Sequence, residues 1–102
     1  MIEDRDGQLI VSGALNQQTV PALLPAGAAL VAQADRVLNL AGIEAVDSSA
    51  IAVVLGWMRA ARAAGKQIRI VEAPAAFLSL ASLYGVTPLL FPETGSEVRG
   101  EH

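Results

Sequence analysis

The segment LAGIEAVDSSAIAVVLGWM, Leu40 to Met58, contains the transition that organises this chain. An apolar run ends, an aspartate and two serines follow, and a long apolar segment begins at once. We predict that Arg36–Leu40 is a buried strand, that Ala41–Val46 is a loop, and that a helix runs from about Ser48 to Ala64. Asp47 or Ser48 would cap this helix by accepting from its free backbone N–H groups.

One face of the predicted helix has the spacing of a core face. Its apolar residues follow the i, i+3, i+4, i+7 pattern, which places side chains along a single stripe. They are Ile51, Val54, Leu55, Met58 and Ala61. We expect this stripe to pack on a sheet.

The flanking segments supply the other elements. Gln8–Gly13 and Gln67–Val71 have the composition of strands, and the acidic EDRDG before Gln8 can supply a hairpin partner and a turn. Helices are expected over Thr19–Ala34, with Thr19 as N-cap, and over Pro74–Leu83. Pro25 predicts a kink in the first of these helices or a later start.

Helices that alternate with buried strands indicate one α/β domain. Gly65 and Gly85 follow the second and third helices, where a left-handed residue commonly ends a helix. VTPLLFP is expected to pack back on the sheet, and residues 93–102 form a polar C-terminal tail.

The composition argues against several classes of protein. There is no cysteine, and the only histidine is the terminal His102, so we expect no metal site and no cofactor. A net charge of −3 without a basic arm argues against nucleic-acid binding. Proline, glycine and polar residues interrupt every long uncharged stretch, so no segment inserts into a membrane. The acidic start lacks the order of a signal peptide, which predicts a cytoplasmic chain.

The residues around Ser48 do not form a predicted catalytic site. A serine nucleophile needs a base within hydrogen-bonding reach, and no histidine or Gly-x-Ser-x-Gly motif supplies one. Asp47 and Glu44 are the only carboxylates near the junction, and both are expected to be hydrated. No glycine-rich phosphate loop is present. We therefore expect that the protein is not an enzyme.

The face of the predicted helix opposite the core stripe is unusually small and apolar. Solvated helix faces normally carry charged side chains, yet this one carries Ser49, Ala52, Val53, Gly56 and Ala60, with Trp57 at its edge. Either the C-terminal helix covers this face, or it is a docking surface for a partner with Trp57 as its anchor.

Four of the seven basic residues lie close together: Arg59, Arg62, Lys66 and Arg69. They form either a solvated helix end that complements the helix dipole or a basic rim for an acidic partner surface.

Three segments of the chain together resemble the STAS domain (sulfate transporter and anti-sigma factor antagonist). They are LIVSGALNQQTVPAL, VLNLAGIEAVDSSAIAVVLGWMRAARAAGKQIRIV and LSLASLYGVTPLL. The resemblance covers about Gln8 to Leu90 and includes a Gly-x-Leu after the early strand, the Asp-Ser-Ser junction and an Ala-Gly-Lys turn. It implies a mixed β-sheet with helices packed mainly on one face, within a STAS-like domain over residues 1–92.

Two family roles follow from this resemblance. MlaB-type members bind the cytoplasmic ATPase of an Mla-type phospholipid-transport ABC complex, which maintains outer-membrane lipid asymmetry, and support its assembly and activity. In anti-sigma factor antagonists, a partner serine kinase phosphorylates the first hydroxyl after the aspartate, here Ser48, and this switches partner binding off. The short length and the LASLYGVTPLL ending are similar to the MlaB type, whereas Ser-Ser-Ala departs from the Thr-Gly-Gly-like residues common there and keeps the antagonist role open.

We therefore expect a non-enzymatic subunit that binds the ABC transporter ATPase and is peripheral to the inner membrane through that partner. The anti-sigma factor antagonist is the alternative, and a free-standing lipid-binding protein is a third. The expected partner-binding residues are Asp47, Ser48, Ser49, Ala52, Val53, Gly56, Trp57 and Arg59. Ser48 would lie at the centre of the contact and Asp47 would hold the loop.

Overall fold

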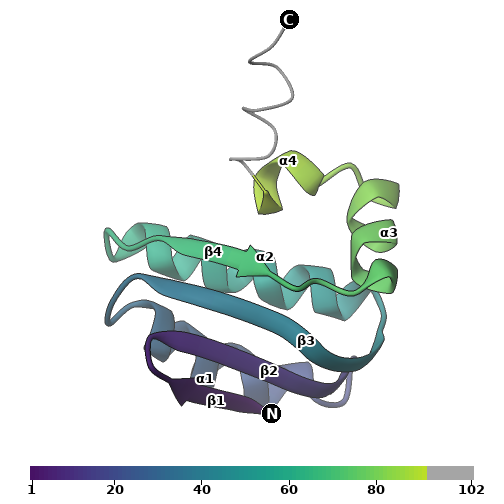
Figure 1. Cartoon of the computed structure of the whole chain (residues 1–102). Helices are drawn as coiled ribbons and strands as arrows, with labels where there is room; N and C mark the ends of the chain where they lie inside the picture. The colour runs from purple at the N-terminus through teal and green to yellow at the C-terminus, as the bar shows by residue number, and fades with distance from the viewer. Residues whose placement is uncertain (92–102) are drawn as a thin grey trace, which may run out of the picture.

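A four-stranded mixed sheet forms the framework of the protein. The computed structural model describes residues 1–91. β1 (Ile2–Arg5) and β2 (Gln8–Leu15) pair antiparallel, whereas β3 (Arg36–Val46) pairs parallel to β2, and β4 (Ile68–Val71) parallel to β3. The spatial order is β1-β2-β3-β4, so β1 and β4 are the edge strands (Figure 1).

The EDRDG segment forms the predicted hairpin. Asp6 and Gly7 connect β1 to β2, and both have positive φ angles, of 53° and 83°. Two-residue hairpin turns of this kind match the twist of the flanking strands, and Asp-Gly is among their preferred sequences.

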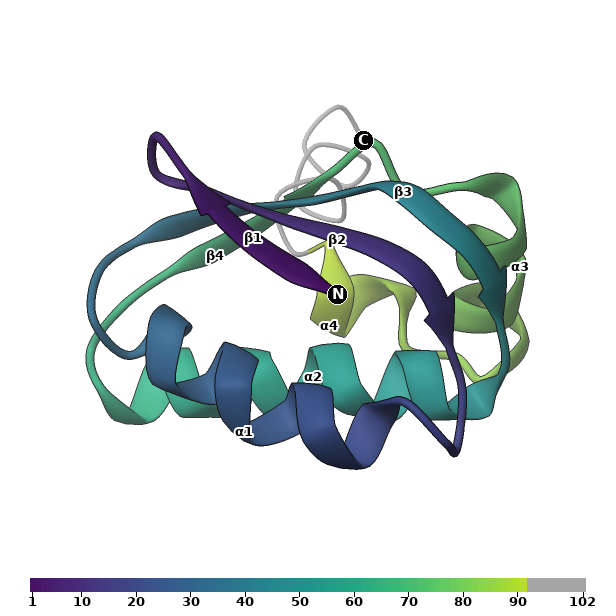
Figure 2. The same ribbon diagram turned by 90° about the horizontal axis from the view of Figure 1, so that it is seen from below.

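Two helices cover one face of the sheet. α1 (Val20–Val31) and α2 (Ser48–Ala63) lie side by side beneath the strands (Figure 2). α3 (Ala75–Leu83) and the single turn α4 (Thr87–Leu90) follow β4 and complete the domain beside that edge (Figure 1). The expected α/β fold, with a mixed sheet and helices packed mainly on one face, is confirmed.

The core lies between this helix layer and the sheet. Leu9, Val11 and Leu15 of β2 are fully buried. Leu38 and Leu40 of β3 are buried beside them, in the period-2 alternation of a strand with one face in the core. Each such side chain contributes about 1.5–3 kcal/mol relative to full exposure.

The core face of α2 is rotated from the predicted stripe. Ile51, Val54 and Ala61 are buried as expected, but Leu55 and Met58 are only half-buried. Val53 of the supposed outer face and Trp57 at its edge are buried instead, as is Ala50, which the sequence pattern assigns to neither face. The rotation arises because α2 packs against α1 as well as against the sheet. The spacing of its large apolar residues indicates only the contact with the sheet.

The structure corrects or extends three local predictions. Ala41–Val46 is not a loop, since β3 continues to Val46 by pairing with the second half of β2. VTPLLFP, for which the sequence predicts no secondary structure, contains the helical turn α4. α1 begins at Val20 and contains Pro25, so the helix does not start late.

The helix termini follow the sequence signals more closely. Gly65 and Gly85 have φ angles of 74° and 69°, which is the left-handed conformation expected just beyond α2 and α3. Thr19 is the residue before α1, but its hydroxyl donates to the carbonyl oxygen of Ala14 at 2.9 Å and does not cap the helix. The tail predicted for residues 93–102 lies outside the described residues.

Candidate functional site

The candidate site lies where β3 passes directly into α2. Asp47 is the N-cap residue, with an extended backbone, and its Oδ1 accepts from the backbone N–H of Ser49 at 2.8 Å. Its backbone carbonyl accepts from the N–H of Ala50 at 2.9 Å. Asp47 therefore holds the junction as predicted and satisfies one of the free N–H groups of the first turn.

Ser48 is the first residue of α2, and its side chain is exposed. Within the described chain, its hydroxyl forms none of the side-chain hydrogen bonds observed, whereas Ser49 is half-buried beside it. Ala52 is exposed one turn further along, and Arg59 is exposed two turns beyond that. Ser48, Ala52 and Arg59 therefore form an outward ridge at i, i+4 and i+11 spacing.

A second loop adjoins this junction and was missed in the sequence. β2 and β3 are parallel, and Leu15 is opposite Val46 in their register. The loop Asn16–Thr19 that leaves β2 therefore emerges beside Asp47, at the end of the sheet where ligand sites of parallel strands commonly lie (Figure 2). Asn16 stabilises this loop, because its Oδ1 accepts from the backbone N–H groups of Gln18 and Thr19 at 2.9 and 3.1 Å.

Trp57 is not an exposed anchor, which corrects the prediction for this residue. Its side chain is fully buried, and its Nε1 donates to the carbonyl oxygen of Leu24 in α1 at 3.0 Å. The indole fills the space above Gly27, where any Cβ atom would overlap the ring. A tryptophan enclosed in this way contributes to packing between helices and is not available to a partner.

Val53 and Gly56 are also covered by the protein's own chain, fully and in part. Val53 is 1% exposed, so it is excluded from the partner surface. Gly56 is half-buried, and a Cβ atom there would lie 2.9 Å from Leu24 Cδ1. Its lack of a side chain therefore leaves room for the end of the Leu24 side chain of α1. The sequence leaves two explanations of this face open: cover by the C-terminal helix, or a docking surface. α1 and not the C-terminal helix covers Gly56 and Trp57. Only the exposed part of the face is available for docking.

The functional groups at this junction are one exposed hydroxyl and one carboxylate that caps the helix. Ser48 offers a hydroxyl at a helix N-terminus, where the partial positive charge of the helix favours anionic groups. No cluster of three or more metal-ligating side chains occurs among residues 1–91. None of the helices in this range is both long and apolar enough to cross a bilayer.

The arrangement of strands and helices defines the class of protein. The chain superposes on the structure of the anti-sigma factor antagonist SpoIIAA in its unphosphorylated form with a TM-score of 0.70 and 19% sequence identity, over 98% of this chain and 96% of that one. It also matches the crystal structure of Mglu with a TM-score of 0.58 and 25% identity, over 74% of this chain but only 19% of Mglu. This is the STAS fold.

A sequence match establishes the family. Residues 1–91 match the family described as "Mlab, STAS domain", and the chain belongs to that family. A search of curated proteins found no match. STAS domains are typically non-enzymatic binding domains, and the resemblance noted in the sequence is thereby confirmed.

Proposed function

We propose that the protein is a non-enzymatic subunit that binds the cytoplasmic ATPase of an Mla-type phospholipid-transport ABC complex. Membership of the MlaB-type STAS family supports this role. The protein would be cytoplasmic and would reach the inner membrane only through the ATPase. No cofactor takes part in this binding.

The binding surface proposed here is the junction surface, which consists of Asp47, Ser48, Ser49, Ala52 and Arg59. One observation carries the proposal: Ser48 and Ala52 are exposed, while Asp47, the only charged residue between Glu44 and Arg59, has its carboxylate bound to the helix backbone. Small uncharged side chains let a partner approach the helix closely and carry little desolvation penalty. Gly56 is at the margin of this surface, while Val53 and Trp57 are beneath it.

The direct test is binding between the full chain and an Mla-type ABC ATPase from the same genome, measured by co-purification and by calorimetry. Ser48→Glu should weaken binding at least about tenfold, or ~1.4 kcal/mol, because it places a charge at the centre of the contact. Ala52→Trp should weaken it similarly by steric overlap. Ser79→Glu introduces the same change at an exposed serine of α3 and should leave affinity unchanged. If Ser48→Glu and Ala52→Trp bind the ATPase as tightly as the wild type and Ser79→Glu do, the junction surface is not the binding site.

An anti-sigma factor antagonist is the second candidate, supported by the exposed Ser48 hydroxyl and by the fold shared with SpoIIAA. A phosphate on Ser48 would add about −1.5 to −2 charge beside Asp47, and this would alter partner binding. Incubation with a neighbouring anti-sigma factor kinase and ATP, followed by mass spectrometry, tests this role. Phosphate on the wild type that is lost in Ser48→Ala would favour it, as would a kinase and a sigma factor encoded next to the gene in place of transporter subunits.

A further inference from the structure

A second surface feature lies at the opposite end of α2 from Ser48. It is a groove of about 720 Å³ lined by residues of the last turns of α2, the edge strand β4 and the end of α4. The 16 residues of α2 span about 24 Å, so the groove is distant from Ser48, although Arg59 of the junction surface is next to Met58 of the groove in the sequence. The apolar residues that line the groove are Met58, Ala61, Ile68, Ile70, Val71, Leu90 and Phe91.

The groove follows a strand edge that has no partner among residues 1–91. The backbone N–H of Arg36 donates to the carbonyl of Gln67 at 2.9 Å, and the next residues of β4 continue this parallel pattern with β3. In a parallel pair, the intervening residues direct both backbone groups away from the neighbouring strand. Ile68 and Ile70 therefore present N–H and C=O groups to the groove, as a template for another strand.

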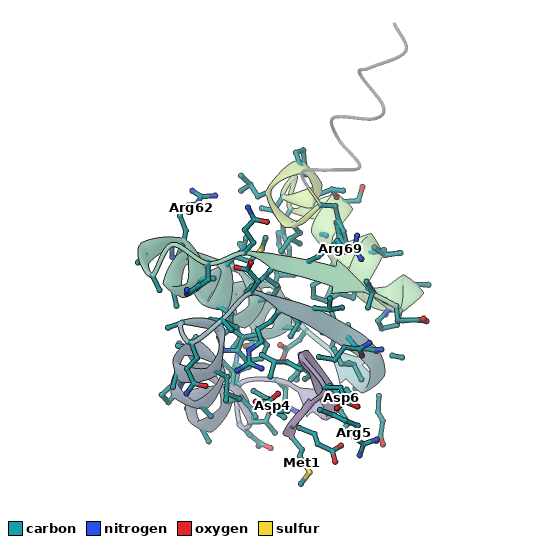
Figure 3. The ribbon with its side chains drawn as sticks, turned by 60° about the vertical axis from the view of Figure 1, so that its left-hand side comes forward. Met1, Asp4, Arg5, Asp6, Arg62 and Arg69 are labelled. Carbon is teal, nitrogen blue, oxygen red and sulfur yellow. The ribbon has the colours of Figure 1, made fainter. Side chains whose placement is uncertain are left out.

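Three basic side chains surround this edge. Arg62, Lys66 and Arg69 line the groove, and none lies within 4.0 Å of a carboxylate in the described part of the chain. Figure 3 shows Arg62 at the end of α2 and Arg69 on β4, both far from Arg5 on the opposite edge strand. The groove therefore combines an apolar floor, free backbone groups and an excess of positive charge.

We propose that this groove binds an extended acidic peptide segment of a partner protein, which adds to β4 as a fifth strand. Strand addition satisfies the free backbone groups of Ile68 and Ile70. Alternate side chains of an added strand point to opposite faces of the sheet. Apolar residues of the segment would pack on Met58 and Leu90, while acidic residues would lie beside Arg69 on the other face.

A labelled peptide of about eight alternating Glu and Val residues provides the probe, and fluorescence anisotropy with the full chain provides the measurement. A Lys–Val peptide tests charge. A Glu–Pro peptide keeps the charge but lacks half of the backbone donors and cannot form a regular strand. We expect the Glu–Val peptide to bind at least about tenfold more tightly than either control.

Variants locate the site on the protein. Arg69→Glu and Lys66→Glu should each weaken Glu–Val binding at least about tenfold, and Arg69→Gln should weaken it less. Arg5→Glu makes the same charge change on the opposite edge strand and should leave the affinity unchanged, as judged on proteins with matching circular dichroism. Arg69→Glu should also retain ATPase binding, so that this proposal and the proposed function can fail separately.

Four results would overturn the proposal. Equal binding of the Glu–Pro peptide would indicate attraction by charge without strand addition. Unchanged affinity in Arg69→Glu and Lys66→Glu would place the peptide elsewhere. A clear gain of affinity in Glu93→Gln with Glu97→Gln would identify acidic residues of this chain as the occupant. A dimer that is lost in Arg69→Glu would identify a second copy.

Discussion

The indole Nε1 of Trp57 donates a hydrogen bond to the backbone carbonyl of Leu24, 33 positions earlier in the chain, at 3.0 Å. This bond joins α2 to α1 on the side of the helix layer away from β4. We expect Trp57→Phe to lower the free energy of unfolding by about 1–2 kcal/mol, because an aromatic ring remains while the N–H donor and part of the buried volume are lost. Trp57→Ala should lower it by about 3–5 kcal/mol.

Urea unfolding monitored by circular dichroism measures both effects. Leu83→Ala is the control, because Leu83 is 75% exposed and its truncation should change stability by less than about 0.5 kcal/mol. A Trp57→Ala protein as stable as the Leu83→Ala protein would contradict the burial of the indole.

Gly27 and Gly56 should respond in opposite ways to alanine. Alanine is favoured over glycine inside a helix by about 1 kcal/mol, so a glycine without steric constraint is improved by the change. At Gly27 the new methyl group would overlap the enclosed indole of Trp57, and we expect a net loss of about 1–2 kcal/mol. At Gly56 it would meet the flexible end of Leu24, so Gly56→Ala should be neutral or stabilising.

Thermal unfolding of the two variants side by side tests this contrast. Destabilisation by Gly56→Ala as large as that by Gly27→Ala would mean that Leu24 cannot move aside and that α1 is as rigidly placed there as at the indole.

Asp47 should stabilise the protein by capping the N-terminus of α2. Asp47→Ala removes the acceptor for the Ser49 N–H and should cost about 0.5–2 kcal/mol, whereas Asp47→Ser or Asp47→Asn should retain most of the stability. Asp35→Ala is a comparison, since Asp35 Oδ1 also accepts a backbone N–H, from Gln67, but between the segments that precede β3 and β4 instead of at a helix start. If Asp47→Ser loses as much stability as Asp47→Ala, a role beyond capping is indicated.

Much of the fold could be predicted because its signals are local. The Asp-Gly turn, the cap at Asp47 and the glycines after α2 and α3 each depend on the backbone within a few residues. The second half of β3 was missed because Ala41–Val46 has little strand character of its own. It becomes a strand through pairing with β2, which no local pattern reports.

The candidate site also combines features with local signals and features that depend on distant parts of the chain. The exposed Ser48 and the capping Asp47 follow from a helix start, whereas the burial of Trp57 depends on where α1 lies. One signal was available in the sequence: VPALLPAGAALV carries no charged residue, which is unusual for a helix with a solvated face. A small residue such as Gly27 in that segment is a suitable neighbour for Trp57, the single aromatic side chain of α2. The nearness of Asn16–Thr19 to Asp47 required the parallel register.

Arg36 provides a further connection between distant elements. Its guanidinium donates to Leu30 O at 3.1 Å, to Gln33 Oε1 at 3.3 Å and to Asp4 Oδ1 at 2.9 Å. The side chain of Arg36 is 9% exposed, and that of Asp4 is 40% exposed. The side chain therefore joins β1 and the end of α1 to the start of β3.

We expect Arg36→Met to lower the free energy of unfolding by about 1–3 kcal/mol, because three hydrogen bonds are lost at once. Arg36→Lys should be more stable than Arg36→Met but less stable than the wild type, since an ammonium group cannot reproduce the planar fork of donors of the guanidinium group. Asp4→Ala should cost less than about 1 kcal/mol, and less still in high salt, because an exposed carboxylate is screened. Urea titrations at low and high salt measure these differences. An Asp4→Ala protein as unstable as Arg36→Met would assign the effect to the ion pair rather than to the bonds with α1.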